Sequence, residues 1–307
     1  MKKLLRKIIP LRLRRCMRSP LILPASYRSR LERYEDIALG DVEHNDDSQF
    51  ALLRQYAHEL DKGLHRKDWV PGHGESAYQK SRCLYRRLIG NESPPNDVFR
   101  WIQNILSEYE QRKRQAPGEV APLASTEEPF RLPPEDMARA IAARVSSRWF
   151  QQKKIQDAVL EQIAEAAVQA PSSCNRQTLQ IFATLDPARA LEILKCFKGF
   201  TGFSPFIPCA MVFCADLRPY QFPNELFIPT LDTALAVENA LLMASAHGLN
   251  ATLLTWGSRN AEEDRRLRHL LEIPNHMEIV VGAACGYPEQ NAIRPARKSV
   301  AETLRLK

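Results

Sequence analysis

Apolar residues recur at helical spacing through residues 26–114, a segment that is otherwise polar. Such spacing is typical of amphipathic helices that bury one face, so the segment predicts a bundle of helices. Asp61–Leu64 and Trp69–Gly74 interrupt the pattern with glycines and a proline, and we expect a loop there. That loop is consistent with a simple chain reversal, or with a loop whose Lys62, His65 and His73 bind an anionic ligand or cover a ligand site. The apolar positions are Leu52, Leu53, Tyr56, Leu60, Val98, Trp101, Ile102, Ile105, Leu106 and Tyr109.

Five prolines and few apolar anchors mark residues 115–134 as a linker. Beyond the linker, periodic apolar positions predict helices over Glu135–Arg144, Ile155–Ala167, Leu231–His247 and Glu262–Leu271. Runs of branched or aromatic residues predict buried strands over Gln180–Leu185, Ala210–Ala215, Ala251–Leu254 and Glu278–Ala284. We therefore divide the chain into a tail (1–25), a helical domain (26–114), a linker (115–134) and a mixed domain of helices and strands (135–307).

The predicted helix Leu231–His247 is apolar on nearly every side, and Gly248 follows it as a typical C-terminal glycine. A helix without a polar face must be buried, so we expect it in the core or between subunits. We identify no stretch of about 20 apolar residues of the kind that spans a membrane.

The formal net charge of +7 is concentrated at the N-terminus, where residues 1–18 hold eight Lys and Arg and no acidic residue. The rest of the chain, at −1, offers no basic face for nucleic-acid phosphates, so we expect no nucleic-acid partner. The tail also carries an apolar stripe, but arginines interrupt it in a way atypical of a secretory signal. It therefore predicts either a solvated basic arm or attachment to an anionic membrane surface.

The seven cysteines form no Cys-x-x-Cys pair, and several lie among apolar residues, as buried thiols do. This pattern indicates a reducing cytoplasm. The seven histidines show no spacing that pairs them with other metal-ligating residues, so we expect no metal.

Two polar motifs carry the candidate chemistry, and the predicted helix Ile155–Ala167 separates them. In the first, Ser146 lies between Arg144 and Arg148, a set that can neutralise and hydrogen-bond a phosphate. The second is Ala-Pro-Ser-Ser-Cys-Asn-Arg-Gln at residues 170–177, which offers hydroxyls, amides and backbone N–H groups. Together they predict a docking edge for an anionic, hydrogen-bonding ligand.

These motifs, with Gly-Tyr-Pro at 286–288 and Arg-Lys-Ser-Val-Ala-Glu at 297–302, resemble the flavin-dependent nitroreductase family from about Pro134 to Leu304. Relatives commonly follow the second motif with Pro-Trp, where this chain has Thr178-Leu179. The resemblance implies an α+β fold, a largely antiparallel sheet wrapped by helices, and a homodimer with two FMN sites at the subunit interface. It also implies ping-pong transfer of two electrons from NAD(P)H, a transient donor, to a small-molecule acceptor.

The resemblance assigns cofactor contacts residue by residue. Arg144, Ser146 and Arg148 fall on phosphate- and ribityl-binding positions, and Arg297 falls on a C-terminal phosphate-binding position. The turn that the partner subunit contributes comprises Pro171, Ser172, Ser173, Asn175 and Gln177. Thr255, Trp256 and Gly257 fall where family members bring backbone close to the flavin ring, although Trp256 also suits core packing. We assign no catalytic residue, because Lys198–Pro208 departs from the family pattern for the donor to flavin N5.

Two other functions remain compatible with these residues. A non-redox scaffold that kept the fold, attached to a membrane and serving polysaccharide assembly, would account for the N-terminal domain. Asp61–Leu64 resembles a Glu-Lys-Gly-Leu region of relatives associated with surface-polysaccharide genes. A flavin enzyme of another reaction, such as reductive dehalogenation or fragmentation of flavin, would share the motifs. We expect a cytoplasmic protein, either free or peripheral at the inner face of the membrane.

Overall fold

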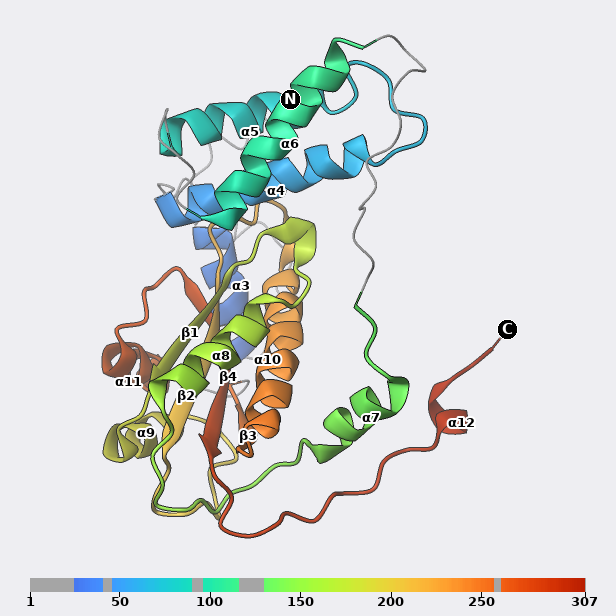
Figure 1. The fold of residues 1–307 in the computed structure, drawn as a ribbon. Coiled ribbons are helices and arrows are strands. Elements are labelled where there is room, and N and C mark those ends of the chain that lie inside the picture. The colour runs from blue at the N-terminus through green and yellow to red at the C-terminus, as the bar shows by residue number, and fades with distance from the viewer. Residues whose placement is uncertain (1–24, 41–45, 90–95, 116–129, 257–260, 307) are drawn as a thin grey trace.

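The computed structural model describes residues 25–40, 46–89, 96–115, 130–256 and 261–306. Four helices lie in the N-terminal part of these ranges: α3 (Ala25–Ile37), α4 (Asp46–Leu64), α5 (Glu75–Leu88) and α6 (Asp97–Lys113). Figure 1 shows α4, α5 and α6 grouped at one end of the molecule, while α3 runs down beside the sheet. The predicted linker at 115–134 lies mostly outside the described residues, and the domain division remains a prediction.

The N-terminal helices α4, α5 and α6 pack around apolar residues, as the sequence predicted. One cluster includes Leu53, Tyr85 and Phe99, and a second includes Leu60 and Tyr109. Because these positions come from all three helices, the group forms a small core of its own.

The expected loop at Asp61–Leu64 is wrong, because α4 continues through Leu64. Leu60 and Leu64 are both buried on one face of α4. Burial of a leucine contributes about 1.5–3 kcal/mol, which outweighs the roughly 1 kcal/mol that Gly63 costs inside a helix. The expected turn at Trp69–Gly74 is confirmed, with Gly72 and Gly74 in the left-handed region at φ 96° and 80°.

Helix α3 packs on the C-terminal part of the chain. Tyr34 and Ala38 share a cluster with Leu217 and Tyr220. The Tyr34 hydroxyl also donates a hydrogen bond to the Phe222 carbonyl over 2.8 Å. Helix α3 therefore connects the N-terminal helices to the sheet.

A four-stranded antiparallel sheet forms the centre of the C-terminal part. Its order is β1 (Leu179–Thr184), β2 (Cys209–Asp216), β4 (Met277–Gly286) and β3 (Asn250–Thr255). All four predicted strands are confirmed. Every residue of β2 is buried, as its continuous apolar run requires at the centre of a sheet. With the surrounding helices this is the predicted α+β architecture.

Helices cover both faces of the sheet. On one face, α8 (Asp157–Val168) and α10 (Ile228–Ala246) share a core with β2 that includes Ile163, Met211 and Leu241. On the other, α9 (Pro187–Leu194) and α11 (Ala261–Leu271) pack around Ile193 and Leu267. The sheet therefore lies between two helical layers.

Helix α10 is the apolar helix that the sequence predicted. By length and hydropathy alone, residues 223–246 qualify as a membrane span, but such a helix is also typical of a soluble core. Its packing against α8 and the sheet accounts for most of its apolar residues. Leu231 and Leu235 nevertheless remain 55% and 41% exposed, so one face of α10 is uncovered in the single chain.

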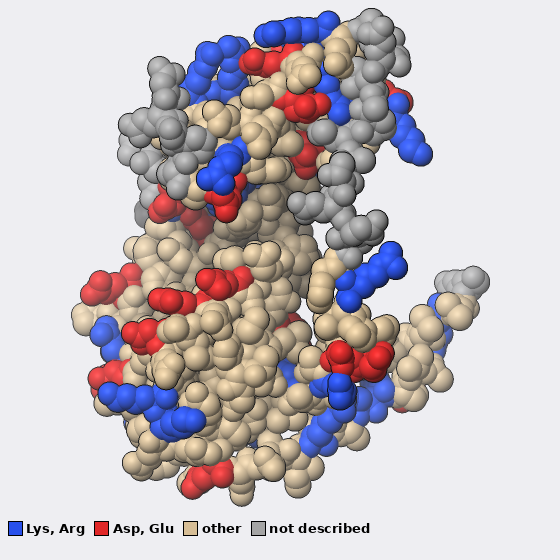
Figure 2. Space-filling model, in the orientation of Figure 1, with Lys and Arg blue, Asp and Glu red and all other residues tan. Residues whose placement is uncertain are grey.

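Two segments extend away from the body (Figure 1). Helix α7 (Pro134–Ala143) has no buried residue, and Ile141 on it is 52% exposed. The arm at 287–306 includes α12 (Val300–Thr303) and carries Ile293, which is 94% exposed. Figure 2 shows basic side chains along this arm where it passes α7. Both segments present apolar residues to solvent.

Candidate functional site

Residues 144–150 form an irregular segment between α7 and α8, and Ser147 fixes it to the sheet. The buried Ser147 hydroxyl accepts a hydrogen bond from Asn250 Nδ2 (2.7 Å). The Ser147 carbonyl accepts a second from Thr252 Oγ1 (2.6 Å). Both donors lie on β3, so the edge of the sheet sets the position of this segment.

The segment also contains three predicted phosphate contacts, which we call the cation row: Arg144, Ser146 and Arg148. None of these three residues takes part in the two bonds to β3. Ser146 and Arg148 are exposed, and Arg144 is half-buried. Arg144 Nε lies 3.8 Å from Glu238 Oε1, while the Arg148 guanidinium lies 6.0 Å from the centre of the Phe203 ring. An ion pair to an exposed carboxylate contributes little. The row therefore retains positive charge that is available to bind an anion.

Arg297, the fourth predicted phosphate contact, lies on the extended arm. Its Nη1 donates to the carbonyls of Pro295 (3.2 Å) and Ala296 (3.3 Å), next to it in sequence. Among the described residues, no hydrogen bond or ion pair joins Arg297 to the cation row. The arm starts beside that row, since Glu289 N donates to the Trp149 carbonyl (3.1 Å), and then leaves the body (Figure 1).

The second motif is a tight turn at residues 171–177, which we call the docking turn. Cys174, Asn175 and Gln177 all have a φ of 53°, a region that residues with a Cβ seldom adopt. Gln177 N donates to Ser172 Oγ (3.1 Å), and Gln177 Nε2 donates to Asn175 Oδ1 (2.9 Å). These bonds hold the predicted polar side chains in one arrangement.

Helix α10 anchors the docking turn through Asp232, whose Oδ2 accepts a hydrogen bond from Ser173 N (2.9 Å). Burial raises the pKa of the Asp232 carboxyl, although the bond from Ser173 opposes the shift. Thr178, where relatives commonly have proline, is buried, and its hydroxyl lies 3.0 Å from the Tyr220 hydroxyl. The departure from the family pattern therefore has a structural role at the end of the turn. Pro171 is exposed at its start.

Arg176 is a site residue that the sequence analysis missed. Its side chain is 2% exposed, and its guanidinium lies 5.0 Å from the centre of the Tyr220 ring. Arg176 Nη2 donates to Glu225 Oε1 (2.6 Å), and Nε donates to Gln55 Oε1 (3.0 Å). The sequence analysis missed Arg176 because an arginine among polar residues usually has a solvated side chain. Its partners lie far away in the sequence, so no local pattern indicates them. The fold alone shows that Arg176 is an internal anchor.

The end of β3 holds the remaining predicted contacts. Thr255 is exposed, and its carbonyl accepts a hydrogen bond from Lys198 N (3.2 Å). Trp256 is buried with its ring 4.8 Å from Phe197, which agrees with core packing. Gly257 lies outside the described residues. The divergent segment Lys198–Pro208 thus begins beside β3, and Ser204 N joins it to the Arg148 carbonyl (2.8 Å).

A small hollow of 110 Å³ adjoins the docking turn. Arg54 of α4, Ser172 and Gln177 of the docking turn and Asp232 of α10 are among the residues that line it. Burial lowers the pKa of Arg54 to about 10, so its guanidinium remains charged at neutral pH. The hollow therefore combines polar groups from the N-terminal helices and from the α+β body.

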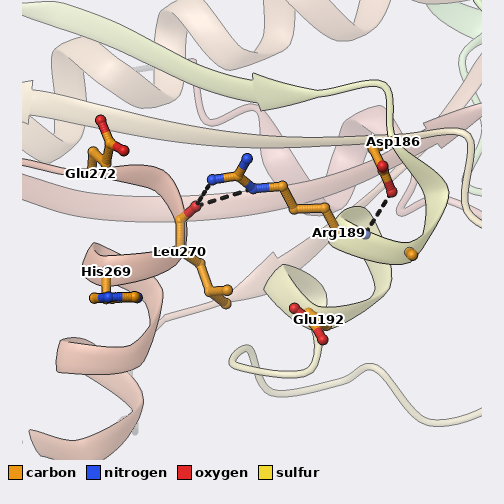
Figure 3. A pocket seen from close by; sticks show the side chains of 7 residues that line it. Asp186, Arg189, Glu192, His269, Leu270 and Glu272 are labelled. Carbon is orange, nitrogen blue, oxygen red and sulfur yellow. Dashed lines mark hydrogen bonds between the residues drawn. The ribbon is translucent and has the colours of Figure 1, made fainter.

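A larger hollow of 610 Å³ lies elsewhere, between α9 and α11. Figure 3 shows Asp186, Glu192 and Glu272 around it, with the Arg189 guanidinium turned to the Leu270 carbonyl. Three carboxylates surround one arginine that already has an acceptor, which disfavours an anionic ligand. This hollow contains no predicted site residue.

The thiol prediction is confirmed where the structure tests it. Cys196, Cys209, Cys214 and Cys285 are buried and free. Within the described ranges, no group of three or more His, Cys, Asp and Glu side chains is placed to hold a metal ion.

Residues 141–201, which include the cation row and the docking turn, match the model of the nitroreductase family. A protein of Archaeoglobus fulgidus named "Putative NADH dehydrogenase/NAD(P)H nitroreductase" is 30% identical over 155 residues, which are 50% of this chain and 87% of that protein. The FMN reductase [NAD(P)H] of Bacillus subtilis is 24% identical over 180 residues, or 53% of this chain and 70% of the relative.

Solved structures resemble about the same share of the chain. An FMN-dependent nitroreductase of Clostridium difficile is 20% identical, with a TM-score of 0.47, and the match covers 55% of this chain and 98% of that one. The NADPH:FMN oxidoreductase of Vibrio harveyi in complex with NAD+ is 21% identical, with a TM-score of 0.46, over 56% and 76% of the two chains.

Proposed function

The chain belongs to the nitroreductase family, and we propose that it is an FMN-dependent oxidoreductase that passes two electrons from NAD(P)H to a small-molecule acceptor. The relatives described above are named as oxidoreductases, which favours an enzyme over a non-redox scaffold. The observation that carries the proposal is the pairing of an outward cation row with a rigid polar turn.

The cation row fits the phosphate of FMN. Two guanidinium groups can donate paired hydrogen bonds to phosphate oxygens, and the hydroxyl of Ser146 can add another. Because β3 holds Ser147 from the other side, the row is presented without a change of backbone. Arg144 and Arg148 would therefore neutralise the phosphate, and Ser146 would orient it.

The docking turn fits the polar edge of a flavin ring. Its hydroxyls and amides already bond to one another, so their directions are set before a ligand arrives. Bound FMN would supply the hydride-transfer chemistry, and the chain would bind and orient it. The sequence contains no Gly-x-Gly-x-x-Gly after a strand, so the nicotinamide nucleotide would visit the site rather than occupy a domain of its own.

Two half-sites from different subunits would form each FMN site. Both halves contact α10, the docking turn through Asp232 and the cation row through Glu238. Six residues of α-helix separate these positions by roughly 9 Å along the axis and about 120° around it. The two halves therefore face different directions in one chain, and a second copy can bring them together.

A homodimer would also cover the apolar surface that the single chain leaves open. Leu231, Leu235 and Val168 are exposed on α10 and α8, and α7 and the arm add more apolar residues. Apolar surface spread over several neighbouring elements is typical of an interface. The arm would carry Arg297 toward a phosphate at that interface.

Titration with FMN, followed by flavin fluorescence, tests the proposed function. Wild-type protein should bind FMN, and NAD(P)H should bleach the bound flavin under anaerobic conditions. Arg148→Ala should weaken binding by about ten- to a hundredfold, because it removes a charge-assisted contact. Arg139→Ala is the matched control, since Arg139 pairs with Asp136 on the neighbouring helix α7. A wild-type protein that stays colourless and ignores FMN would contradict the proposal.

The basic tail would add a peripheral membrane contact to a cytoplasmic enzyme. Residues 1–18 hold eight cations and lie outside the described residues. Each cation near an anionic surface contributes about 1 kcal/mol, and screening at 1 M salt shortens the reach to about 3 Å. We expect salt-sensitive sedimentation with anionic vesicles that is lost when residues 1–18 are removed. Equal sedimentation of both forms would make the tail a solvated arm.

A further inference from the structure

The N-terminal helix α4 contacts the docking turn directly, through two adjacent residues. Arg54 Nε and Nη2 donate to the Arg176 carbonyl over 3.0 and 2.8 Å, and Nη2 also reaches the Gln177 carbonyl at 3.3 Å. Gln55 Oε1 accepts from Arg176 Nε at 3.0 Å. The Arg54 guanidinium thus bonds the carbonyls of two successive turn residues, Arg176 and Gln177. Gln55, the next residue of α4, bonds the side chain of Arg176.

This contact acts where the backbone most needs support. Residues on both sides of Arg176 adopt left-handed φ angles, and such a backbone persists only when its surroundings over-determine it. The α+β body supplies part of that support through Asp232 and Glu225. The rest comes from α4, more than a hundred residues earlier in the chain.

The chemistry of Arg54 suits this role. A guanidinium has a planar fork that can hold two carbonyls at once, which a lysine ammonium cannot reproduce. Burial lowers the pKa of Arg54, as expected for a guanidinium that is largely removed from water where it makes these bonds. Its side chain also forms one wall of the 110 Å³ hollow beside Ser172 and Gln177.

We propose that Arg54 and Gln55 are positioning residues for the flavin site, so that the N-terminal helices set the geometry of the docking turn. This inference rests on the proposed function, because the turn has a cofactor to position only if the chain binds FMN. It gives the N-terminal helices a role in the reductase site itself. Loss of the contact would loosen the turn and weaken FMN binding without removing any residue that touches FMN.

Hydrogen exchange of the cofactor-free, full-length protein tests the contact. Backbone amides of the peptide 171–178 should exchange faster in Arg54→Met and Gln55→Leu than in wild type. Arg112→Met is the matched control, because Arg112 is also buried and also bonds a carbonyl, that of Leu64, but within the N-terminal helices. Unchanged exchange at 171–178 in Arg54→Met, or the same acceleration in Arg112→Met, would overturn the inference.

FMN titration of the same proteins tests the consequence. Arg54→Met should bind FMN about tenfold more weakly, a typical size for coupling between separate parts of a protein. Arg54→Lys, with one point charge, should recover only part of the loss, and Arg112→Met should bind as wild type. Equal FMN affinity of wild type and Arg54→Met would overturn this inference alone. Absence of FMN binding by wild type would overturn the proposed function, and the positioning role with it.

Discussion

The cation row and the docking turn, the two halves of the proposed FMN site, differ in how many partners each has within the chain. The row has one long ion pair, from Arg144 to Glu238, and a contact of Arg148 with the Phe203 ring, while Ser146 and Arg148 are exposed. The turn is bonded to α4, to α10 and to Glu225. The docking turn is therefore preformed, whereas the cation row carries positive charge that can bind an anion.

Because of this difference, changes in the two halves should affect different quantities, the free energy of unfolding in one and the affinity for a ligand in the other. A change in the docking turn should alter the free energy of unfolding even without cofactor, because buried groups lose partners. A change in the cation row should leave the unfolding free energy nearly unchanged and alter only the affinity for an anionic ligand.

The largest effect should come from Arg176→Leu, which leaves the Glu225 carboxylate enclosed without its cation. Breaking a buried ion pair on one side costs about 3–5 kcal/mol. Urea denaturation of cofactor-free protein should show this loss, whereas Arg148→Leu should stay within about 0.5 kcal/mol of wild type, as surface changes do. Similar losses for the two variants would remove the contrast between the halves.

Next in size is the effect of Arg144→Ala/Arg148→Ala on FMN affinity. At about 1.5 kcal/mol for each charge-assisted contact, the loss of both predicts FMN binding that is weaker by roughly a hundredfold. Fluorescence titration measures the affinity, and urea denaturation of the same variant supplies the control. If the double variant unfolds far more easily than wild type, the row is part of the fold rather than an open anion site.

Ser172→Ala should have a smaller effect, of about 1 kcal/mol, because it removes one hydrogen bond to Gln177 N inside the turn. The loss should appear in the unfolding free energy without FMN. Ser146→Ala, in the cation row, is the matched change and should leave the unfolding free energy unaltered. Equal losses of unfolding free energy in the two variants would show that both serines contribute to the stability of the fold to the same extent.

The smallest effect concerns pH. Burial raises the pKa of Asp232 above its ordinary value of 3.8, so the folded protein holds this proton more tightly than the unfolded chain. Wild-type stability should therefore fall, relative to Asp232→Asn, as pH rises from about 4 through the raised pKa. Unfolding free energies of both proteins across that range measure the difference. A relative gain of wild-type stability with rising pH would contradict the assignment.

Much of the fold was predictable from the sequence, because burial sets the pattern of each element. The continuous apolar run of β2 identifies a strand that the core encloses, and the all-round apolar surface of α10 identifies a helix that is buried on all but one face. Gly63 misled the prediction at the end of α4, since a local turn signal competes with the burial of Leu64 and loses. Where a local turn signal and burial compete, tertiary contacts determine the secondary structure more than residue type does.

The sequence identifies the two motifs of the candidate site, but neither their connections nor Arg54 and Arg176. Spacing alone places Ser146 between two arginines and gathers the polar groups of the docking turn. The roles of Arg54 and Arg176 depend on partners more than a hundred residues apart, which no local pattern encodes. These long-range bonds form only when α4 packs on the sheet domain.

A mixed dimer tests most directly the claim that the two halves meet across a subunit interface. One subunit would carry Arg144→Ala/Arg148→Ala, and the other would carry alanine at Ser172, Asn175 and Gln177, with different affinity tags for purification. Each chain then has one intact half. A composite site predicts one FMN per mixed dimer and none in either parent dimer. A mixed dimer that folds as wild type and binds no FMN would show that both halves of a site come from one chain, and would rule out a composite site.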